Sequence, residues 1–170
     1  QHFKHNENDA SSIPANVILA INEDADNNLW VSTENGGISI FNYTTGKITN
    51  YKNDDIDKES ISNNSVYAIY RDAKNNMWLG NFAGGVDMAS RDKTQFLHYR
   101  HMMLNNSLSH NQVLTIMEDR NKNIWIGTDG GGLNLFNPAT DNFTHYRHQK
   151  NNDQSICGDY ILNTLEDSKG

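Results

Sequence analysis

Three pairs of histidines are separated by two residues, a spacing that raises the question of a metal site. The pairs are His2 with His5, His98 with His101, and His145 with His148. Residues three positions apart on a β-strand point to opposite faces, so one strand cannot turn both imidazoles toward one ion. We therefore expect exposed histidines on outer strands, with no metal site and no cofactor.

Four aspartates recur at nearly constant intervals and could be mistaken for catalytic carboxylates. They are Asp24, Asp72, Asp119 and Asp167, separated by 48, 47 and 48 residues. An aspartate at the start of an Asn-rich turn commonly accepts hydrogen bonds from nearby backbone N–H groups. We interpret the four as turn residues and assign no catalytic residue.

A tryptophan follows each of the first three aspartates by six positions, at Trp30, Trp78 and Trp125. An exposed indole could stack on a sugar ring, but a periodic large aromatic more often packs between sheets. Glycine pairs follow at 36–37, 84–85 and 131–132, without the helix and lysine of a phosphate-binding loop. We expect buried indoles and glycine turns.

These residues are positioned by a repeat of 47 or 48 residues. Each unit has a short apolar run, an Asn-rich turn, the Trp segment, the glycine pair, an alternating segment such as I-S-I-F, and a segment with one tyrosine. Four short strands in a unit of about 40 to 50 residues are typical of a β-propeller blade. A β-sandwich, the alternative, would not require such constant spacing. The predicted fold class is all-β, a partial β-propeller of three four-stranded antiparallel blades plus flanking strands.

The repeat also predicts how the chain is divided. The first strands of the units are expected at Ile18–Glu23, Val66–Arg71, Val113–Glu118 and Ile161–Glu166. The predicted parts are residues 1–5 (outer strand of a preceding blade), 12–53, 60–101 and 107–148 (three blades), and 155–170 (inner strand of a following blade). Because propellers close with about four to eight blades, this looks like a piece of a longer chain. We expect its open ends to self-associate or its terminal strands to be disordered.

Composition excludes some partners. The 170 residues carry a net charge of −7, and an acidic surface repels phosphate, so we expect no contact with nucleic acid. No run of about 18 apolar residues is present. The single cysteine, Cys157, has no partner for an internal disulfide.

The repeat resembles a known family. The phrase S-L-S-x-N-x-V-x-x-I-x-E-D, followed by N-I-W-I-G-T-x-G-G-G-L-N-L-F-N-P, is similar to the two-component regulator propeller repeat. Residues 107–148 match almost throughout. Residues 12–53 and 60–101 match with lapses, such as Ser32 for glycine and Asn81-Phe82 for Thr-Asp or Thr-Glu.

The resemblance implies a function. Such repeats occur in the periplasmic sensor region of hybrid two-component proteins of Bacteroides-like bacteria, ahead of a membrane span and a histidine kinase, and many of these proteins respond to oligosaccharides. The implied partners are an oligosaccharide, the remaining blades and the downstream domains. The chain contains no kinase, receiver or DNA-binding segment, so this fragment is not expected to be an enzyme, and the family motif itself transfers no binding residue.

Candidate binding residues are those that vary between repeats on one rim. The connection between blades and the turn between the second and third strands emerge on the same face, and binding usually resides in loops on a rigid scaffold. Amides, carboxylates and an aromatic platform would suit a carbohydrate. Asparagine recurs at 16, 64 and 111, so it could equally be a structural turn residue. The candidates are Asn16, Glu34, Asn64, Phe82, Gln112, Asp129 and Tyr160.

Three functions stay open at this point. The first is a sensor whose ligand shifts the population of a signalling state. The second is a protein-interaction scaffold. The third is a propeller lyase or glycosidase, which would need a carboxylate pair, or a histidine and a tyrosine, converging at the channel mouth. The repeated motifs supply no unique pair of that kind.

Overall fold

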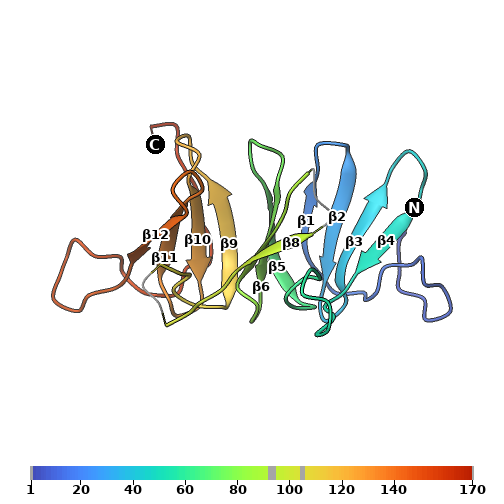
Figure 1. The fold of residues 1–170 in the computed structure, drawn as a ribbon, viewed down its shortest axis with the longest axis horizontal. Helices are drawn as coiled ribbons and strands as arrows, with labels where there is room; N and C mark the ends of the chain where they lie inside the picture. The colour runs from blue at the N-terminus through green and yellow to red at the C-terminus, as the bar shows by residue number, and fades with distance from the viewer. Residues whose placement is uncertain (1, 92–94, 104–105, 170) are drawn as a thin grey trace.

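The computed structural model describes residues 2–91, 95–103 and 106–169. It contains three four-stranded antiparallel sheets, which lie side by side (Figure 1). The first sheet has the order β1-β2-β3-β4, with β1 Ile18–Glu23, β2 Asn28–Thr33, β3 Gly37–Asn42 and β4 Ile48–Tyr51. Each strand therefore pairs with the next one along the chain.

The other two sheets repeat this order. The second contains β5 Val66–Arg71, β6 Met77–Asn81, β7 Val86–Ala89 and β8 Phe96–Tyr99. The third contains β9 Val113–Glu118, β10 Ile124–Thr128, β11 Leu133–Asn137 and β12 Asn142–Tyr146. The predicted all-β partial propeller of three four-stranded antiparallel blades is confirmed. In the described part of the chain, no helix is long and apolar enough to cross a membrane.

The flanking segments differ from the strands predicted for them. Gln1 and Gly170, at the two ends of the predicted flanking segments, lie outside the described residues. Residues 2–5 form no strand, and neither does 161–166, which is preceded by a single bridge between Asp129 and Tyr160. A strand requires a neighbouring strand for its ladder, and the chain does not supply the rest of these two sheets. Residues 161–166 have the sequence pattern of the first strand of a blade, but the second strand that would pair with it is not part of this chain.

The segment after Tyr160 nevertheless lies against the third blade. The backbone N–H of Ile161 donates to the carbonyl of Thr128 at 3.0 Å, and the hydroxyls of Thr115 and Thr164 are 3.3 Å apart. The segment therefore follows the inner edge of the third blade although it forms no ladder. An ion pair of 3.1 Å between Arg120 and Glu166 adds a further contact.

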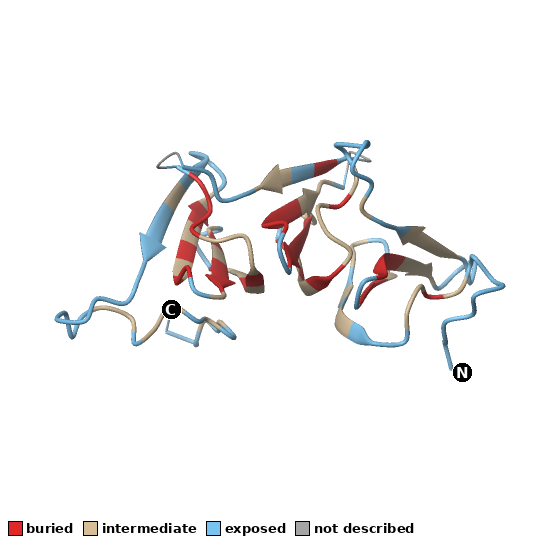
Figure 2. Cartoon of the chain, turned by 90° about the horizontal axis from the view of Figure 1, so that it is seen from below, coloured by how far each residue is buried: buried red, intermediate tan, exposed pale blue. Residues whose placement is uncertain are grey.

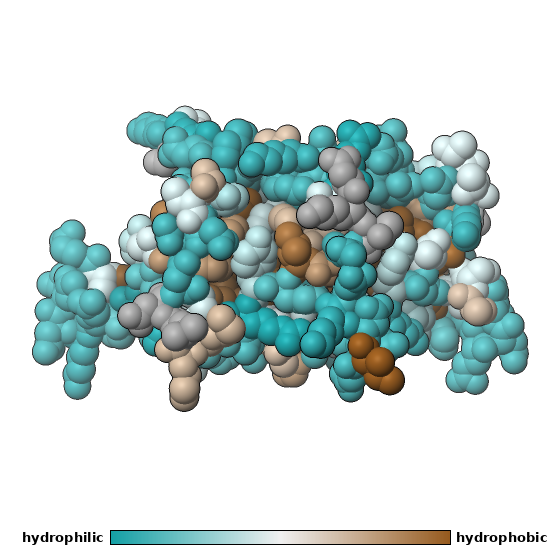
Figure 3. Space-filling model, in the orientation of Figure 1, coloured by the Kyte–Doolittle hydropathy of each residue, from teal (hydrophilic) through white to brown (hydrophobic). Residues whose placement is uncertain are grey.

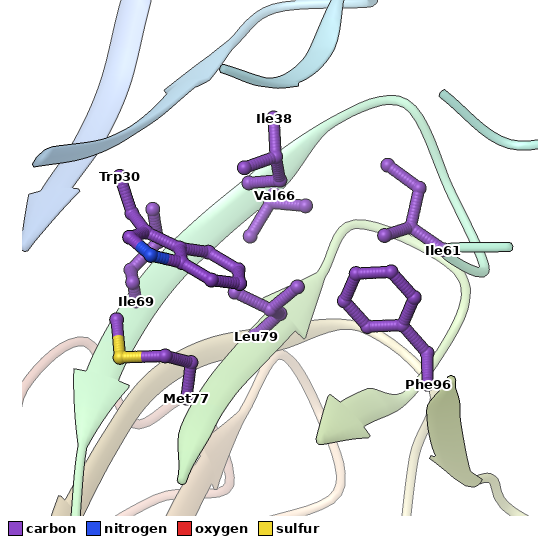
Figure 4. Close-up of a cluster of buried hydrophobic side chains, with 8 residues drawn as sticks. All are labelled: Trp30, Ile38, Ile61, Val66, Ile69, Met77, Leu79 and Phe96. Carbon is purple, nitrogen blue, oxygen red and sulfur yellow. The ribbon is translucent and has the colours of Figure 1, made fainter. Parts of the chain in front are cut away.

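The hydrophobic cores lie between the sheets. One cluster joins the first two blades (Figure 4); it consists of Trp30, Ile38, Ile61, Val66, Ile69, Met77, Leu79 and Phe96. A second cluster joins the second and third blades; it consists of Trp78, Val86, Leu108, Val113, Ile116, Ile124, Ile126 and Phe136. Figure 2 shows that most buried residues lie in the central strands of the sheets, whereas the two ends of the chain are exposed or half-buried.

Trp30 and Trp78 are buried between sheets, as predicted, but Trp125 is only half buried. Its equivalents are covered by the next blade, and after the third blade the chain supplies only the segment 155–169. Trp125 stacks on Tyr146 with ring centroids 5.6 Å apart, as Trp78 does on Tyr99 at 5.7 Å.

Each repeated aspartate of the three blades holds both the hairpin turn and the tryptophan. In the third blade, Asp119 Oδ1 accepts the backbone N–H groups of Asn121 and Asn123 at 2.9 Å. Its other oxygen, Oδ2, accepts the indole N–H of Trp125 at 2.9 Å. The same indole bond occurs at 2.9 Å in the first blade and 2.8 Å in the second. The turn interpretation is therefore right, and the indole bond explains the six-residue spacing.

Burial and hydrogen bonding also shift the pKa values of Asp24 and Asp119. Burial alone would raise the pKa of Asp24, but bonds from Trp30, Asn28 and the backbone lower it below its usual value. The same balance lowers the pKa of Asp119. The charged carboxylate is therefore the form that the turn requires.

The second glycine of each pair connects one blade to the next. Gly37, Gly85 and Gly132 have positive φ, and their N–H groups donate to the carbonyls of Asn64, Asn111 and Asp159 at 2.8–2.9 Å. A Cβ at these positions would lie 2.1–2.3 Å from a tyrosine carbonyl oxygen at the end of the fourth strand. Only glycine suits both the backbone conformation and the space.

Replacing Trp78 by alanine should lower the free energy of unfolding by about 3–5 kcal/mol, because its indole is 1% exposed between two sheets. Trp125→Ala should cost less, since this indole is half buried. Urea unfolding of the two variants checks the order. An equal or larger loss for Trp125→Ala would contradict the inter-blade packing.

The open end faces predict self-association of the 170-residue chain. Large apolar side chains are exposed at both ends, with Ile21 at 55% beside the first blade and Leu165 at 90% beyond the third. Exposed apolar faces and unpaired edges are association sites. Multi-angle light scattering should show dimers or larger species that grow with concentration; a monomer throughout would oppose this expectation.

Candidate functional site

The turns between the second and third strands lie beside the starts of the first strands. Backbone N–H groups of Glu34, Phe82 and Asp129 donate to the carbonyls of Val17, Ser65 and Gln112 at 2.9–3.0 Å. The three turn residues therefore occupy equivalent places in successive blades, along the lower edge in Figure 1. We call this edge the rim. Hydrophilic side chains cover most of the molecule in this orientation (Figure 3).

The second blade carries an aromatic pair on the rim. The rings of Phe82 and Tyr67 meet edge to face with centroids 5.6 Å apart, and Phe82 is 44% exposed. Tyr67 lies at a register shift between Val66 and Ala68 in β5, and such bulges re-aim a side chain. The first and third blades have Leu19 and Leu114 at this position. Sequence reasoning missed Tyr67, although this departure from the repeat could have indicated it.

Three other candidates come together where the third blade meets the C-terminal segment. The side-chain amide of Gln112 donates to the Asp129 carboxylate at 2.7 Å. Asp129 also forms the bridge to Tyr160, whose residue is 71% exposed. This group offers an amide, a carboxylate and an exposed phenol side by side. Glu34 is exposed at the turn of the first blade.

Asn16 and Asn64 have structural roles. Their Oδ1 atoms accept the backbone N–H groups of His5 and Asn53 at 2.9 and 2.8 Å. Asn111 does the same for His101 at 2.6 Å. These bonds close the loop that leads into each blade.

Of the six paired histidines, only His98 and His145 lie on outer strands, and five of the six contact loop carbonyls through ring nitrogens. The Nδ1 atoms of His5, His101 and His148 lie 2.8–2.9 Å from the carbonyl oxygens of Ile13, Leu108 and Ile156. Within the described residues, no three His, Cys, Asp or Glu side chains gather so as to hold a metal ion.

His98 belongs to a polar cluster that only the second blade carries. Its Nδ1 lies 2.7 Å from Oδ1 of Asp87, a carboxylate whose side chain is fully buried. The other oxygen of Asp87 accepts the backbone N–H of Ser62 at 2.7 Å. The Nε2 atom of His98 lies 2.8 Å from the carbonyl oxygen of Lys58. The hydrogen bond with Asp87 is the main reason that the pKa of His98 is raised.

Comparison with known proteins finds matches to one family model and a shared fold. The family model "Two component regulator propeller" matches residues 12–35, 60–83 and 107–130. Each matched segment includes the first strand of a blade, the aspartate turn and the Trp strand. No curated protein matches the chain.

Several solved structures share the fold. The extracellular domain of a putative one component system from B. thetaiotaomicron aligns with a TM-score of 0.73 and 22% identity, over 92% of this chain and 20% of that one. The extracellular domain of a putative hybrid two component system from B. thetaiotaomicron aligns with a TM-score of 0.70 and 22% identity, over 99% and 26%.

A third neighbour is a structural genomics protein of unknown function from Bacteroides thetaiotaomicron VPI-5482. It has a TM-score of 0.59 and 15% identity, over 86% of this chain and 41% of that chain. This chain therefore spans between a fifth and about two fifths of these neighbours. The TM-scores of 0.59–0.73 establish a common fold, and the sequence identities of 15–22% carry nothing beyond it.

The His98–Asp87 pair predicts a pH dependence of stability. The pKa of His98 is raised above that of an unfolded histidine, about 6.5. The stabilisation is therefore fully present below about pH 6.5 and is lost as the pH rises through the folded-state pKa. The difference in melting temperature between the wild type and His98→Asn should shrink from pH 5.5 to pH 9.

His145→Asn is the matched control, because the residue opposite His145 is the neutral Asn134. Asparagine also occupies the equivalent position in the first blade, at Asn50, so the substitution suits the scaffold. A His98→Asn difference that is constant or grows with pH would contradict the charged pair.

Proposed function

We propose that this chain, three segments of which match the two-component regulator propeller model, is a segment of the sensor region of a hybrid two-component system. The three matched repeats and the shared fold with two extracellular domains support this proposal. The segment would lie in the periplasmic or extracellular portion of an inner-membrane protein. The parent chain would supply the remaining blades and a sensor histidine kinase with its response regulator.

The proposed ligand is an oligosaccharide, and the observation that carries this is the composition of the rim. The Phe82–Tyr67 pair offers an exposed apolar ring face. Gln112, Asp129 and Tyr160 offer donors and acceptors for hydroxyl groups. A few convergent polar groups beside an aromatic surface are what a sugar requires. The segment itself would be non-catalytic.

Signalling would follow from differential binding. A ligand can shift a receptor between two states only as far as its affinities for those states differ. Because the blades are joined through buried cores and glycine contacts, a ligand bridging two blades would favour one arrangement of the rim. That arrangement would be transmitted through the parent chain to control transcription.

A second candidate function, a protein-interaction scaffold, is favoured by a different observation. Ile56 and Met103 occupy equivalent positions in the loops that lead into the second and third blades, and both are almost fully exposed. Large apolar side chains at exposed loop tips can serve as contact points for a protein partner. The two candidates differ in which loop residues matter.

Phe82→Ala in the full-length receptor should raise the oligosaccharide concentration for half-maximal induction about tenfold, equivalent to ~1.4 kcal/mol of lost binding. Asn121→Gln, in the aspartate turn at the opposite edge of the third blade, is the control and should leave induction unchanged. A reporter gene driven by the receptor gives the readout. The reverse pattern would place the ligand on the other edge, and a loss with Ile56→Ser alone would favour the scaffold.

A further inference from the structure

A groove of about 590 Å³ lies beside the second blade, between the loop that leads into β5 and the end of β8. Its volume falls within the roughly 300–1,000 Å³ that small-molecule sites occupy. Asp54, Asp55 and Asp57 line one part of it, and His98 and Arg100 line another. The groove is separate from the candidate residues Gln112, Asp129 and Tyr160.

The cluster of Ser62, Asp87 and His98 behind this groove contains a buried carboxylate, although a neutral side chain serves the same structural role in another blade. In the third blade, the neutral Asn134 accepts the backbone N–H of Ser109 at 2.8 Å, as Asp87 does for Ser62. In the first blade the equivalent residue is Ser39, and Pro14 there has no N–H to bind. A fully buried carboxylate is more costly than an amide unless it is paired. Asp87 is therefore explained by His98, whose two ring nitrogens both lie beside acceptors, Asp87 Oδ1 and the Lys58 carbonyl, an arrangement that suits a doubly protonated imidazole.

The arrangement of Ser62, His98 and Asp87 is unsuited to nucleophilic catalysis. In a catalytic triad the aspartate binds one imidazole nitrogen and the serine binds the other. Here the Ser62 hydroxyl and Asp87 both lie on the Nδ1 side of His98, and Nε2 is taken by the Lys58 carbonyl. No imidazole nitrogen is left to accept the serine proton. The cluster holds groups in place and does not react.

The same cluster fixes the cationic wall of the groove. The guanidinium of Arg100 donates to the Ser62 hydroxyl at 3.0 Å. The contact between His98 and the Lys58 carbonyl ties the acidic loop to the outer strand. The lining of the groove therefore includes a guanidinium donor and three carboxylate acceptors.

We propose that this groove is a binding site for one unit of a neutral or amino-bearing oligosaccharide. The proposal rests on the proposed function and names the ligand class and the site. Carboxylates accept hydrogen bonds from hydroxyl or ammonium groups, and Arg100 donates to hydroxyl or ring oxygens. Asp87 balances the charge of His98. Among the other lining residues, the three carboxylates exceed the two cations Arg100 and Lys58 by one negative charge. Uronates and sulfated sugars are disfavoured by this balance.

The position of the groove relative to the aromatic pair suits a chain of sugars. Ala83 and Gly84 line the groove, and they directly follow Phe82 in the same turn. An oligosaccharide stacked on Phe82 could therefore continue over this turn and place its next units in the groove. The aromatic pair and the groove both belong to the second blade. Its residues at Phe82 and in the acidic loop differ from those of the other blades.

Calorimetric titration of the 170-residue chain tests the proposal with three hexasaccharide probes: cellohexaose, chitosan hexasaccharide and oligogalacturonate. We expect one of the first two to bind and oligogalacturonate to bind at least tenfold more weakly. Arg100→Ala and Asp55→Asn should each weaken binding about tenfold or more. Arg147→Ala, the equivalent substitution in the third blade, is the matched control and should leave binding unchanged.

The outcomes separate this proposal from the proposed function. If Phe82→Ala weakens binding while Arg100→Ala and Asp55→Asn do not, the rim binds sugar and the groove proposal is wrong. If oligogalacturonate binds best, the ligand class is wrong. If none of the probes binds at millimolar concentration, the groove proposal is overturned. The proposed function is overturned separately, if no oligosaccharide induces the full-length receptor. His98→Asn should weaken binding as Arg100→Ala does, because it releases the acidic loop.

Discussion

The fold depends on one hydrogen-bonded group, the aspartate at the end of each first strand. In the second blade, Asp72 accepts two backbone N–H groups of its turn and the indole N–H of Trp78. One carboxylate thus closes the hairpin and fixes the orientation of the side chain that fills the space between blades. The glycine contacts then set the distance to the next blade. A blade without a neighbour cannot bury this indole, as the half-buried Trp125 shows.

Much of the fold could be predicted because its determinants are local and repeated. The alternation in Ile38–Phe41, the constant spacing of the aspartates and the glycine pairs each restrict the chain within a few residues. The first strands of the three blades begin and end at the predicted residues. The segment 161–166 has the same pattern but no strand, because pairing depends on residues that are not adjacent in sequence.

The candidate site could be predicted only in part, for the same reason. The varying rim positions indicated Phe82 and Asp129, since variation within a repeat is visible in the sequence. Tyr67 was missed because its contact with Phe82 depends on a bulge. The role of Asp87 was missed because its burial, and its pairing with His98 across two strands, appear only in three dimensions. Two of these four residues therefore became candidates only when the structure was known.

A double-mutant cycle between Asp72 and Trp78 tests the central claim most directly. Asp72→Asn, Trp78→Phe and the double variant would be unfolded in urea, and their losses in free energy compared with the wild type. If the carboxylate holds the indole, the two losses should be non-additive, with a coupling of about 1.5–3 kcal/mol, as for a hydrogen bond to a charged group. Losses that add within about 0.5 kcal/mol would contradict this account.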